Sequence, residues 1–226
     1  MQYKQIVTGY FLERPNRFIA HVEVNGEEKI CHVKNTGRCR ELLTPRAKVI
    51  LAKGENPNRK TEYDLIAVYK GDRLINLDSQ APNAVFGEWV RRSEYFSELT
   101  FVKPEYTYKN SRFDYYLEAG NRRIFVEVKG VTLEQDGVTM FPDAPTARGE
   151  KHLRELSDAV KNGYEAFVFF VIQMDGCKYF TPNRKTDPDF ASALEQAAAD
   201  GVQLRAVTCR VAENRLEIDD FAEIRL

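Results

Sequence analysis

Alternation of apolar and polar positions dominates the first eighty or so residues of the chain and predicts short β-strands. β-Branched and aromatic residues recur with this spacing in six runs, at 5–12, 18–24, 28–34, 48–52, 63–69 and 74–77. Turn signals such as Asn25-Gly26 and Gly71-Asp72 separate the runs. So many short strands in so short a stretch favour a small closed barrel over an open sheet. An oligonucleotide-binding (OB) barrel and a small SH3-like barrel both fit the pattern.

The pattern changes at Ser79-Gln80-Ala81-Pro82, where helical spacing of apolar residues begins. We predict an α/β part with helices at 83–98, 146–162 and 187–199, an extended stretch at 101–108, and strands at 166–172 and 202–211. Gly163 fits a C-terminal helix cap, and Asp187-Pro188 fits a helix start. We therefore expect two domains, a barrel at 1–80 and an α/β domain at 81–226.

Within the second domain, two alternating runs flank Gly120-Asn121, which predicts a tight β-hairpin with a two-residue loop. In that register Asp114 lies opposite Glu127, with Cβ atoms about 4.5–5.5 Å apart. Facing carboxylates destabilise a hairpin unless something compensates, and a divalent cation with a preference for oxygen ligands would do so. Lys129 lies on the same face as Glu127 because side chains alternate along a strand. The hairpin therefore predicts a metal site.

Composition places the chain among ordinary globular proteins, with 43% hydrophobic and 30% charged residues and a net charge of −1. No apolar stretch approaches the roughly 18–20 residues of a membrane span, and the N-terminus lacks the plan of a signal peptide. We expect a cytoplasmic protein with no membrane partner. The charge is uneven: residues 1–80 carry a net +4 and residues 81–226 a net −5. A binding module joined to a metal-using module fits this division, although ordinary fluctuation also produces it.

Four cysteines are scattered along the chain at Cys31, Cys39, Cys177 and Cys209, without a Cys-x-x-Cys pair. A zinc site needs about four ligands at set spacings, and Cys31, His32 and Cys39 supply three at most. Reduced, mostly buried thiols are the better interpretation.

A strand–turn–strand unit that carries Asp114 and then Glu127-x-Lys129 resembles the minimal core of the PD-(D/E)xK nucleases. In such a site Asp114 and Glu127 hold Mg²⁺ or Mn²⁺, and Lys129 orients or helps deprotonate the attacking water. The same spacing occurs by chance in many chains, and Glu-x-Lys on an exposed strand is usually only a solvated face. The surrounding elements support the catalytic interpretation, because their predicted αβββαβ order is that of a restriction-endonuclease-like mixed sheet flanked by helices.

Longer motifs make the resemblance specific. The segment 141–149 (Phe-Pro-Asp-Ala-Pro-Thr-Ala-Arg-Gly), the run 126–133 (Val-Glu-Val-Lys-Gly-Val-Thr-Leu) and the stretch 31–38 (Cys-His-Val-Lys-Asn-Thr-Gly-Arg) resemble the sugar fermentation stimulation protein A family over nearly the whole chain. The resemblance implies an N-terminal OB-like domain, a PD-(D/E)xK-like domain and DNA as the partner. It also implies a regulatory part in the use of maltose and other sugars.

Candidate contacts to nucleic acid lie in both domains. Arg148 and His152 are four residues apart and share one helix face, from which they would reach a phosphate beside the metal; a surface arginine and a boundary histidine are the alternative. In the barrel, loop residues on an OB scaffold contact phosphates and bases. We expect this role for Arg17, Asn35, Thr36 and Arg38.

Two functions follow. The first is a DNA-binding, magnesium-dependent phosphodiesterase (a nuclease) with Asp114, Glu127 and Lys129 as catalytic residues. The second is a non-catalytic DNA-binding regulator of sugar metabolism built on a nuclease fold. The intact set of two acids and a lysine favours the first, because a binding protein gains nothing from burying carboxylates that repel. No protein partner can be inferred from the sequence.

Overall fold

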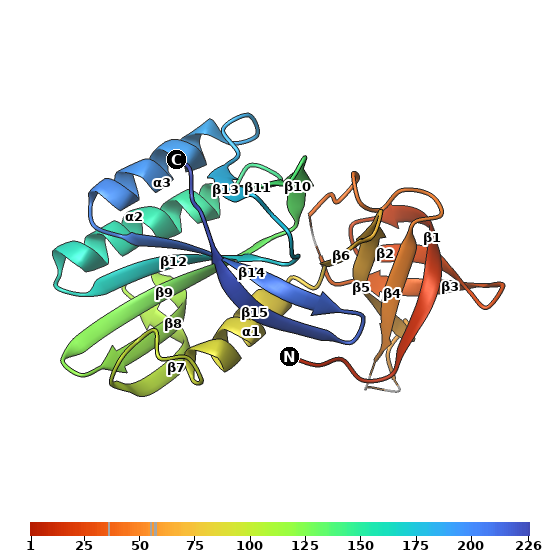
Figure 1. Ribbon diagram of the computed structural model, residues 1–226, viewed down its shortest axis with the longest axis horizontal. Helices are drawn as coiled ribbons and strands as arrows, with labels where there is room; N and C mark the ends of the chain where they lie inside the picture. Colours follow the sequence, from red (N-terminus) through yellow and green to blue (C-terminus); the bar gives the residue numbers. More distant parts are fainter. Residues whose placement is uncertain (36, 55, 57) are drawn as a thin grey trace.

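The computed structural model describes residues 1–35, 37–54, 56 and 58–226. Figure 1 shows a β-barrel on the right, formed by the N-terminal part of the chain, and a larger α/β unit on the left. The barrel strands are β1 (Ile6–Asn16), β2 (Ile19–Val24), β3 (Glu27–Val33), β4 (Lys48–Lys53), β5 (Tyr63–Lys70) and β6 (Arg73–Asn76).

The barrel closes through a pairing between strands that are not consecutive. The strand order is β3-β2-β1-β4-β5-β6, and β3 also pairs in parallel with β5, from Cys31↔Tyr63 to Val33↔Leu65. Five strands thus form a closed OB-like barrel, and β6 continues the sheet beyond β5. Along β2 every second residue is buried, which fills the interior of the barrel as the alternating pattern predicts. The predicted fold class is confirmed.

The second unit is built on a six-stranded mixed sheet. Its order is β15-β14-β12-β9-β8-β7, with parallel pairs only between β9 and β12 and between β12 and β14. The strands are β7 (Leu99–Tyr108), β8 (Ser111–Ala119), β9 (Arg122–Val131), β12 (Glu165–Ile172), β14 (Gln203–Ala212) and β15 (Arg215–Ala222). Helix α1 (Ala81–Val90) covers one face, and α2 (Ala147–Lys161) and α3 (Pro188–Ala199) lie on the other (Figure 1).

Local sequence explains where α2 and α3 begin and end. The Thr146 hydroxyl accepts a hydrogen bond from the Gly149 amide and caps α2, and Gly163 follows that helix with a φ of +81°. The Asp187 carboxylate caps α3 by accepting from the Phe190 amide, and Pro188 occupies the first turn. Strand β12 is buried on both faces between these helices and α1, as its continuous apolar run indicates.

Two expectations differ from the structure. The first helix ends at Val90, not at residue 98. Phe96, which continued the helical spacing in the sequence, is buried from the irregular connection that follows the helix. Four strands were not expected. Three of them form a small sheet of their own, β10 (Leu133–Gln135), β11 (Val138–Phe141) and β13 (Tyr179–Pro182), and the fourth is β15 at the sheet edge.

The segment that joins the two units is held by buried polar contacts. Asp78 is fully buried, and its Oδ2 accepts a hydrogen bond from Lys34 Nζ over 2.7 Å. From the second unit, Gln173 Nε2 donates to Asn76 Oδ1 and to the Asp78 carbonyl, over 2.9 and 3.0 Å. Satisfied buried polar groups fix a single arrangement, so the barrel and the α/β unit meet in a defined orientation.

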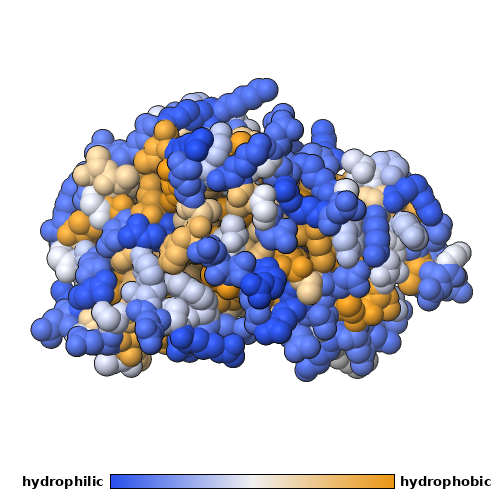
Figure 2. Space-filling view, in the orientation of Figure 1, coloured by the Kyte–Doolittle hydropathy of each residue, from blue (hydrophilic) through white to orange (hydrophobic). Residues whose placement is uncertain are grey.

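The surface in Figure 2 is mostly hydrophilic, with apolar side chains visible in smaller patches over both units. Within the described part of the chain, no helix has the length and apolar character needed to cross a membrane.

Candidate metal centre and nucleic-acid surface

The β8–β9 hairpin has the predicted register. Residues 120 and 121 form the loop, Gly120 has a φ of +57°, and the pairs run from Ala119↔Arg122 to Tyr115↔Val126. Asp114 and Glu127 are the next positions in this register. There the backbone ladder stops, and the Val128 amide donates instead to Asp114 Oδ2 over 2.8 Å. The hairpin therefore opens where its two carboxylates lie.

Asp114 is positioned from the first helix as well as from the hairpin. Its Oδ1 accepts a hydrogen bond from Asn83 Nδ2 over 2.9 Å. The Tyr115 hydroxyl donates to the Asn83 carbonyl over 2.7 Å and fixes that turn of α1 against β8. Sequence analysis missed Asn83, because an asparagine in a helix carries no signal for such a contact.

Glu127 is almost fully buried, with 3% of its surface exposed. Its Oε1 accepts from Lys129 Nζ over 2.6 Å and also contacts His152 Nδ1, which must donate because an ionised carboxylate only accepts. Its Oε2 is buried and has no hydrogen-bond partner among the described residues. A buried carboxylate oxygen without a partner costs free energy unless a ligand or cation completes it.

The two carboxylates differ in electrostatic environment. Burial, and then the charge of Glu127, raise the pKa of Asp114 above its ordinary value. Burial alone would also raise the pKa of Glu127, but Lys129 and His152 outweigh it, so that this pKa lies below its ordinary value. Glu127 is thus held as an anion. Asp114 is the carboxyl group whose ionised form an added positive charge would stabilise most.

These residues fit a hard divalent cation. The donor set is two carboxylates, one with a free buried oxygen, and Mg²⁺ typically takes one or two carboxylates while it keeps several waters. No group of three or more His, Cys, Asp or Glu residues suited to a metal occurs in the described parts of the chain. A site with many protein ligands, of the kind that zinc prefers, therefore has no candidate there.

Arg148 and His152 take different positions although they share one helix. His152 is 6% exposed and turns toward Glu127, so its described contact is with the carboxylate rather than with solvent. Arg148 lies in the first turn of α2, is exposed, and makes no hydrogen bond or ion pair with any described residue. Asp143, which precedes α2, is not its cap, because Thr146 takes that role.

The barrel residues of the predicted nucleic-acid surface gather around the loop after β3. Arg17 and Arg38 line one cavity of about 310 Å³ together with Arg40. Asn35 lines a second cavity of about 160 Å³, between the barrel and the α/β unit, and its Oδ1 accepts from the Gly37 amide over 2.7 Å. Thr36 lies outside the described residues.

The fold defines the class: an OB-like barrel joined to an α/β domain with a mixed sheet and helices α1, α2 and α3. Comparison with family models agrees. The SfsA N-terminal OB domain matches residues 12–77, and the sugar fermentation stimulation protein RE domain matches residues 80–215. The chain belongs to the sugar fermentation stimulation protein family.

Similar proteins cover the whole chain. A sugar fermentation stimulation protein homolog of Desulfitobacterium hafniense (strain Y51) is 60% identical over 226 residues, which are 100% of this chain and 99% of the relative. The homolog of Clostridium beijerinckii is 53% identical, with 100% of both chains covered. A solved structure of Pyrococcus furiosus SfsA in complex with Ca²⁺ is similar with a TM-score of 0.91 and 25% identity, covering 100% of this chain and 98% of that one.

Proposed function

We propose that this protein binds DNA and hydrolyses phosphodiester bonds with the help of Mg²⁺ or Mn²⁺. The observation that carries the proposal is the buried Glu127 Oε2, which has no partner among the described residues and belongs to a carboxylate next to Asp114 in the hairpin register. A protein that only needed a stable hairpin would do better with an apolar pair at these positions.

Asp114 and Glu127 would hold the cation. Asn83 and the Val128 amide fix Asp114, while Lys129 and His152 fix Glu127 Oε1 and leave Oε2 free. A bound divalent cation lowers the pKa of its water and neutralises charge that builds on the phosphate. Lys129, 15% exposed at its side chain, would orient the attacking water, and the exposed Arg148 would contact a phosphate.

A relative supports the metal part of this proposal. The Pyrococcus furiosus protein, which shares the fold over the full chain, is described in complex with Ca²⁺, a cation that takes oxygen ligands as Mg²⁺ does. The same chemistry suits the carboxylate pair of this chain.

A metal-dependent cleavage screen over single-stranded, double-stranded and branched DNA, and over RNA, tests the proposal. We expect Mg²⁺- or Mn²⁺-dependent cleavage that falls by at least about 100-fold in Asp114→Asn and in Glu127→Gln. Asp72→Asn, in the exposed β5–β6 turn, is the matched control and should cleave normally. Normal cleavage by both site variants would refute the assignment of Asp114 and Glu127 to the catalytic site.

One observation favours the second candidate, a DNA-binding regulator of sugar use without turnover. Lys129 pairs with Glu127 and His152 contacts the same carboxylate oxygen, so Glu127 is held as an anion without a cation. For that candidate we expect DNA binding that survives Asp114→Asn, and no cleavage of any substrate in the same screen.

A further inference from the structure

Most arginines of this protein have a polar partner. Among the residues that the structure describes, five make no side-chain hydrogen bond or ion pair, and these are Arg17, Arg38, Arg40, Arg92 and Arg148. Three of the five, Arg17, Arg38 and Arg40, line one and the same cavity of about 310 Å³ on the barrel. Free cations gathered in one concavity repel one another, which an anionic ligand would relieve.

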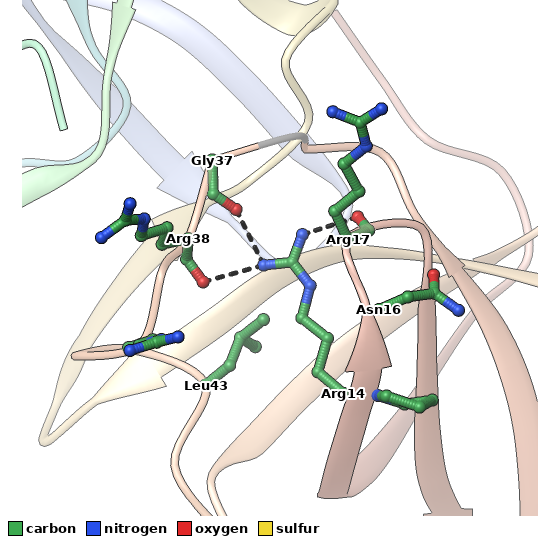
Figure 3. Close-up of a pocket in the computed structure, with 8 residues that line it drawn as sticks. Arg14, Asn16, Arg17, Gly37, Arg38 and Leu43 are labelled. Atoms are coloured by element: carbon green, nitrogen blue, oxygen red, sulfur yellow. Dashed lines mark hydrogen bonds between the residues drawn. The ribbon is translucent and has the colours of Figure 1, made fainter. Parts of the chain in front are cut away.

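Arg14 also lines this cavity, and both of its terminal nitrogens bind the protein's own backbone, while its buried Nε has no hydrogen-bond partner among the described residues. Its Nη1 donates to the Gly37 and Arg38 carbonyls, both over 2.9 Å, and its Nη2 donates to the Arg17 and Asn35 carbonyls, both over 2.7 Å. Figure 3 shows the guanidinium between these loop segments, with the Arg17 and Arg38 side chains extending away from it.

The hydrogen bonds of Arg14 to these four carbonyl groups have an electrostatic consequence. Four carbonyl oxygens pointing into one cavity would oppose an anion, but Arg14 binds all four. The described lining contains no carboxylate; it consists of the four arginines with Pro15, Asn16, Gly37 and Leu43. The charged side chains of the described lining are therefore all basic, and the carboxylate nearest Gly37, Asp143, lines the second cavity. Arg14 acts as a positioning residue for the two loops that carry Arg17 and Arg38.

We propose that this cavity binds the terminal phosphate of a nucleic-acid strand, an inference that rests on the proposed binding of nucleic acid. Three guanidinium groups suit a phosphomonoester, which carries a charge of about −1.5 to −2 near neutral pH, better than a phosphodiester with a single charge. Guanidinium groups also match phosphate oxygens bidentately.

The position of the cavity suits a strand end. Gly37 lines both this cavity and the second one, which reaches Gly130 on β9, the residue after Lys129. A strand whose end is held by Arg17, Arg38 and Arg40 would then continue along the seam between the two domains toward the carboxylate hairpin.

Fluorescence anisotropy with the full-length protein in EDTA tests this without cleavage. The probes are one labelled single-stranded DNA of about ten nucleotides, made with a phosphate at one end, at the other end, or at neither end. We expect one phosphorylated form to bind at least about fivefold more tightly than the unphosphorylated form. Arg38→Gln/Arg40→Gln should erase this ratio, and Arg92→Gln, an equally unpaired arginine on the α/β domain, should keep it. All three positions are exposed, and melting curves will show that the variants fold.

Competition distinguishes the strand end from a free phosphate compound. Inorganic phosphate should compete only at concentrations far above those of the phosphorylated DNA, whereas tighter binding of inorganic phosphate than of the DNA end overturns the assignment. Equal affinities for the three DNAs, or a ratio that persists in the double variant, also overturn it. If the protein binds the phosphorylated DNA more tightly but cleaves nothing, the proposed nuclease activity is refuted and the proposed phosphate site is not. If it cleaves DNA but binds all three DNAs equally, the phosphate site is refuted and the nuclease activity is not.

Discussion

Asn83 and Asp114 come from different elements, α1 and β8, and the Asn83 amide donates to Asp114 Oδ1 over 2.9 Å. Through this bond the helix that follows the linker fixes one carboxylate of the hairpin. The other oxygen of Asp114 is fixed by the Val128 amide. Asp114 is therefore oriented before any cation binds, which lowers the entropic cost of forming a metal site.

Replacement of Asn83 by alanine should weaken metal binding and cleavage together. The change removes one of the two donors to Asp114 and leaves the ligands themselves in place. Loss of such a supporting hydrogen bond typically costs about 10–100-fold in metal affinity or activity. Isothermal titration with Mn²⁺ measures the affinity, and Asn110→Ala is the control, because that side chain, in the turn before β8, bonds to no described residue. Unchanged affinity in Asn83→Ala would show that the contact does not orient the site.

Asp114→Asn should raise the melting temperature of the metal-free protein. Burial and the charge of Glu127 raise the pKa of Asp114, so its ionised form is less favourable in the folded than in the unfolded state at neutral pH. The amide removes this cost and can still accept from the Val128 amide, while its nitrogen can donate to the Asn83 side-chain oxygen once the Asn83 amide turns over. For a chain of this size each kcal/mol gained corresponds to about 2–4 °C. Thermal melting in EDTA measures the gain, and a lower melting temperature would contradict the electrostatic argument.

The hairpin shows what local sequence can predict. A two-residue Gly120-Asn121 loop and strict alternation fix a register, so the facing of Asp114 and Glu127 followed without any long-range information. The capped helices α2 and α3 were predictable for the same local reason. The closure of the barrel through β3 and β5 was only implied by strand number, because nothing in either strand specifies its partner.

The supporting residues of the site could not be found in this way. Asn83 reaches Asp114 across 31 positions of the chain. Arg14, which belongs to no motif that the sequence analysis singled out, binds four backbone carbonyls. Carbonyl groups carry no residue-specific signal, so an arginine that organises a loop has the same sequence pattern as one that is solvated.

Gly130→Ala should impair cleavage through packing. A Cβ at this position would lie 2.6 Å from Gln173 Oε1 and 2.7 Å from Pro82 Cγ. Gln173 cannot easily move, because its Nε2 is bonded to Asn76 and Asp78, and Pro82 belongs to the first turn of α1, beside Asn83.

We expect Gly130→Ala to cost about 1–3 kcal/mol in the free energy of unfolding. The same change should lower the rate of cleavage by shifting α1 away from Asp114. Urea denaturation and the cleavage assay measure the two effects, and Thr132→Ala, which lines the same cavity without adding atoms, is the control. Normal stability in Gly130→Ala would mean that the seam is looser than these contacts indicate.

Glu134 should make the stability of the protein sensitive to acid. Its Oε2 accepts from Lys70 Nζ over 2.6 Å, and its Oε1 lies 3.1 Å from Arg73 Nη1, so it joins β10 of the α/β domain to β5 and β6 of the barrel. Burial alone would raise the pKa of Glu134, but Lys70, the Gly137 amide and Arg73 together hold it below its ordinary value of 4.5.

A carboxylate whose pKa is depressed by folding stabilises the protein fully above its unfolded pKa, and this contribution is lost as the pH falls through the folded pKa. Glu134→Gln should therefore unfold at lower urea concentration than wild type at pH values well above 4.5, and the difference should shrink as the pH falls below that value. Glu105→Gln is the control, since that carboxylate is exposed, pairs only with Arg112 over 3.6 Å, and lies away from the seam. A difference between Glu134→Gln and wild type that stays constant across this pH range would mean that the ion pairs at the seam do not depend on the charge of Glu134.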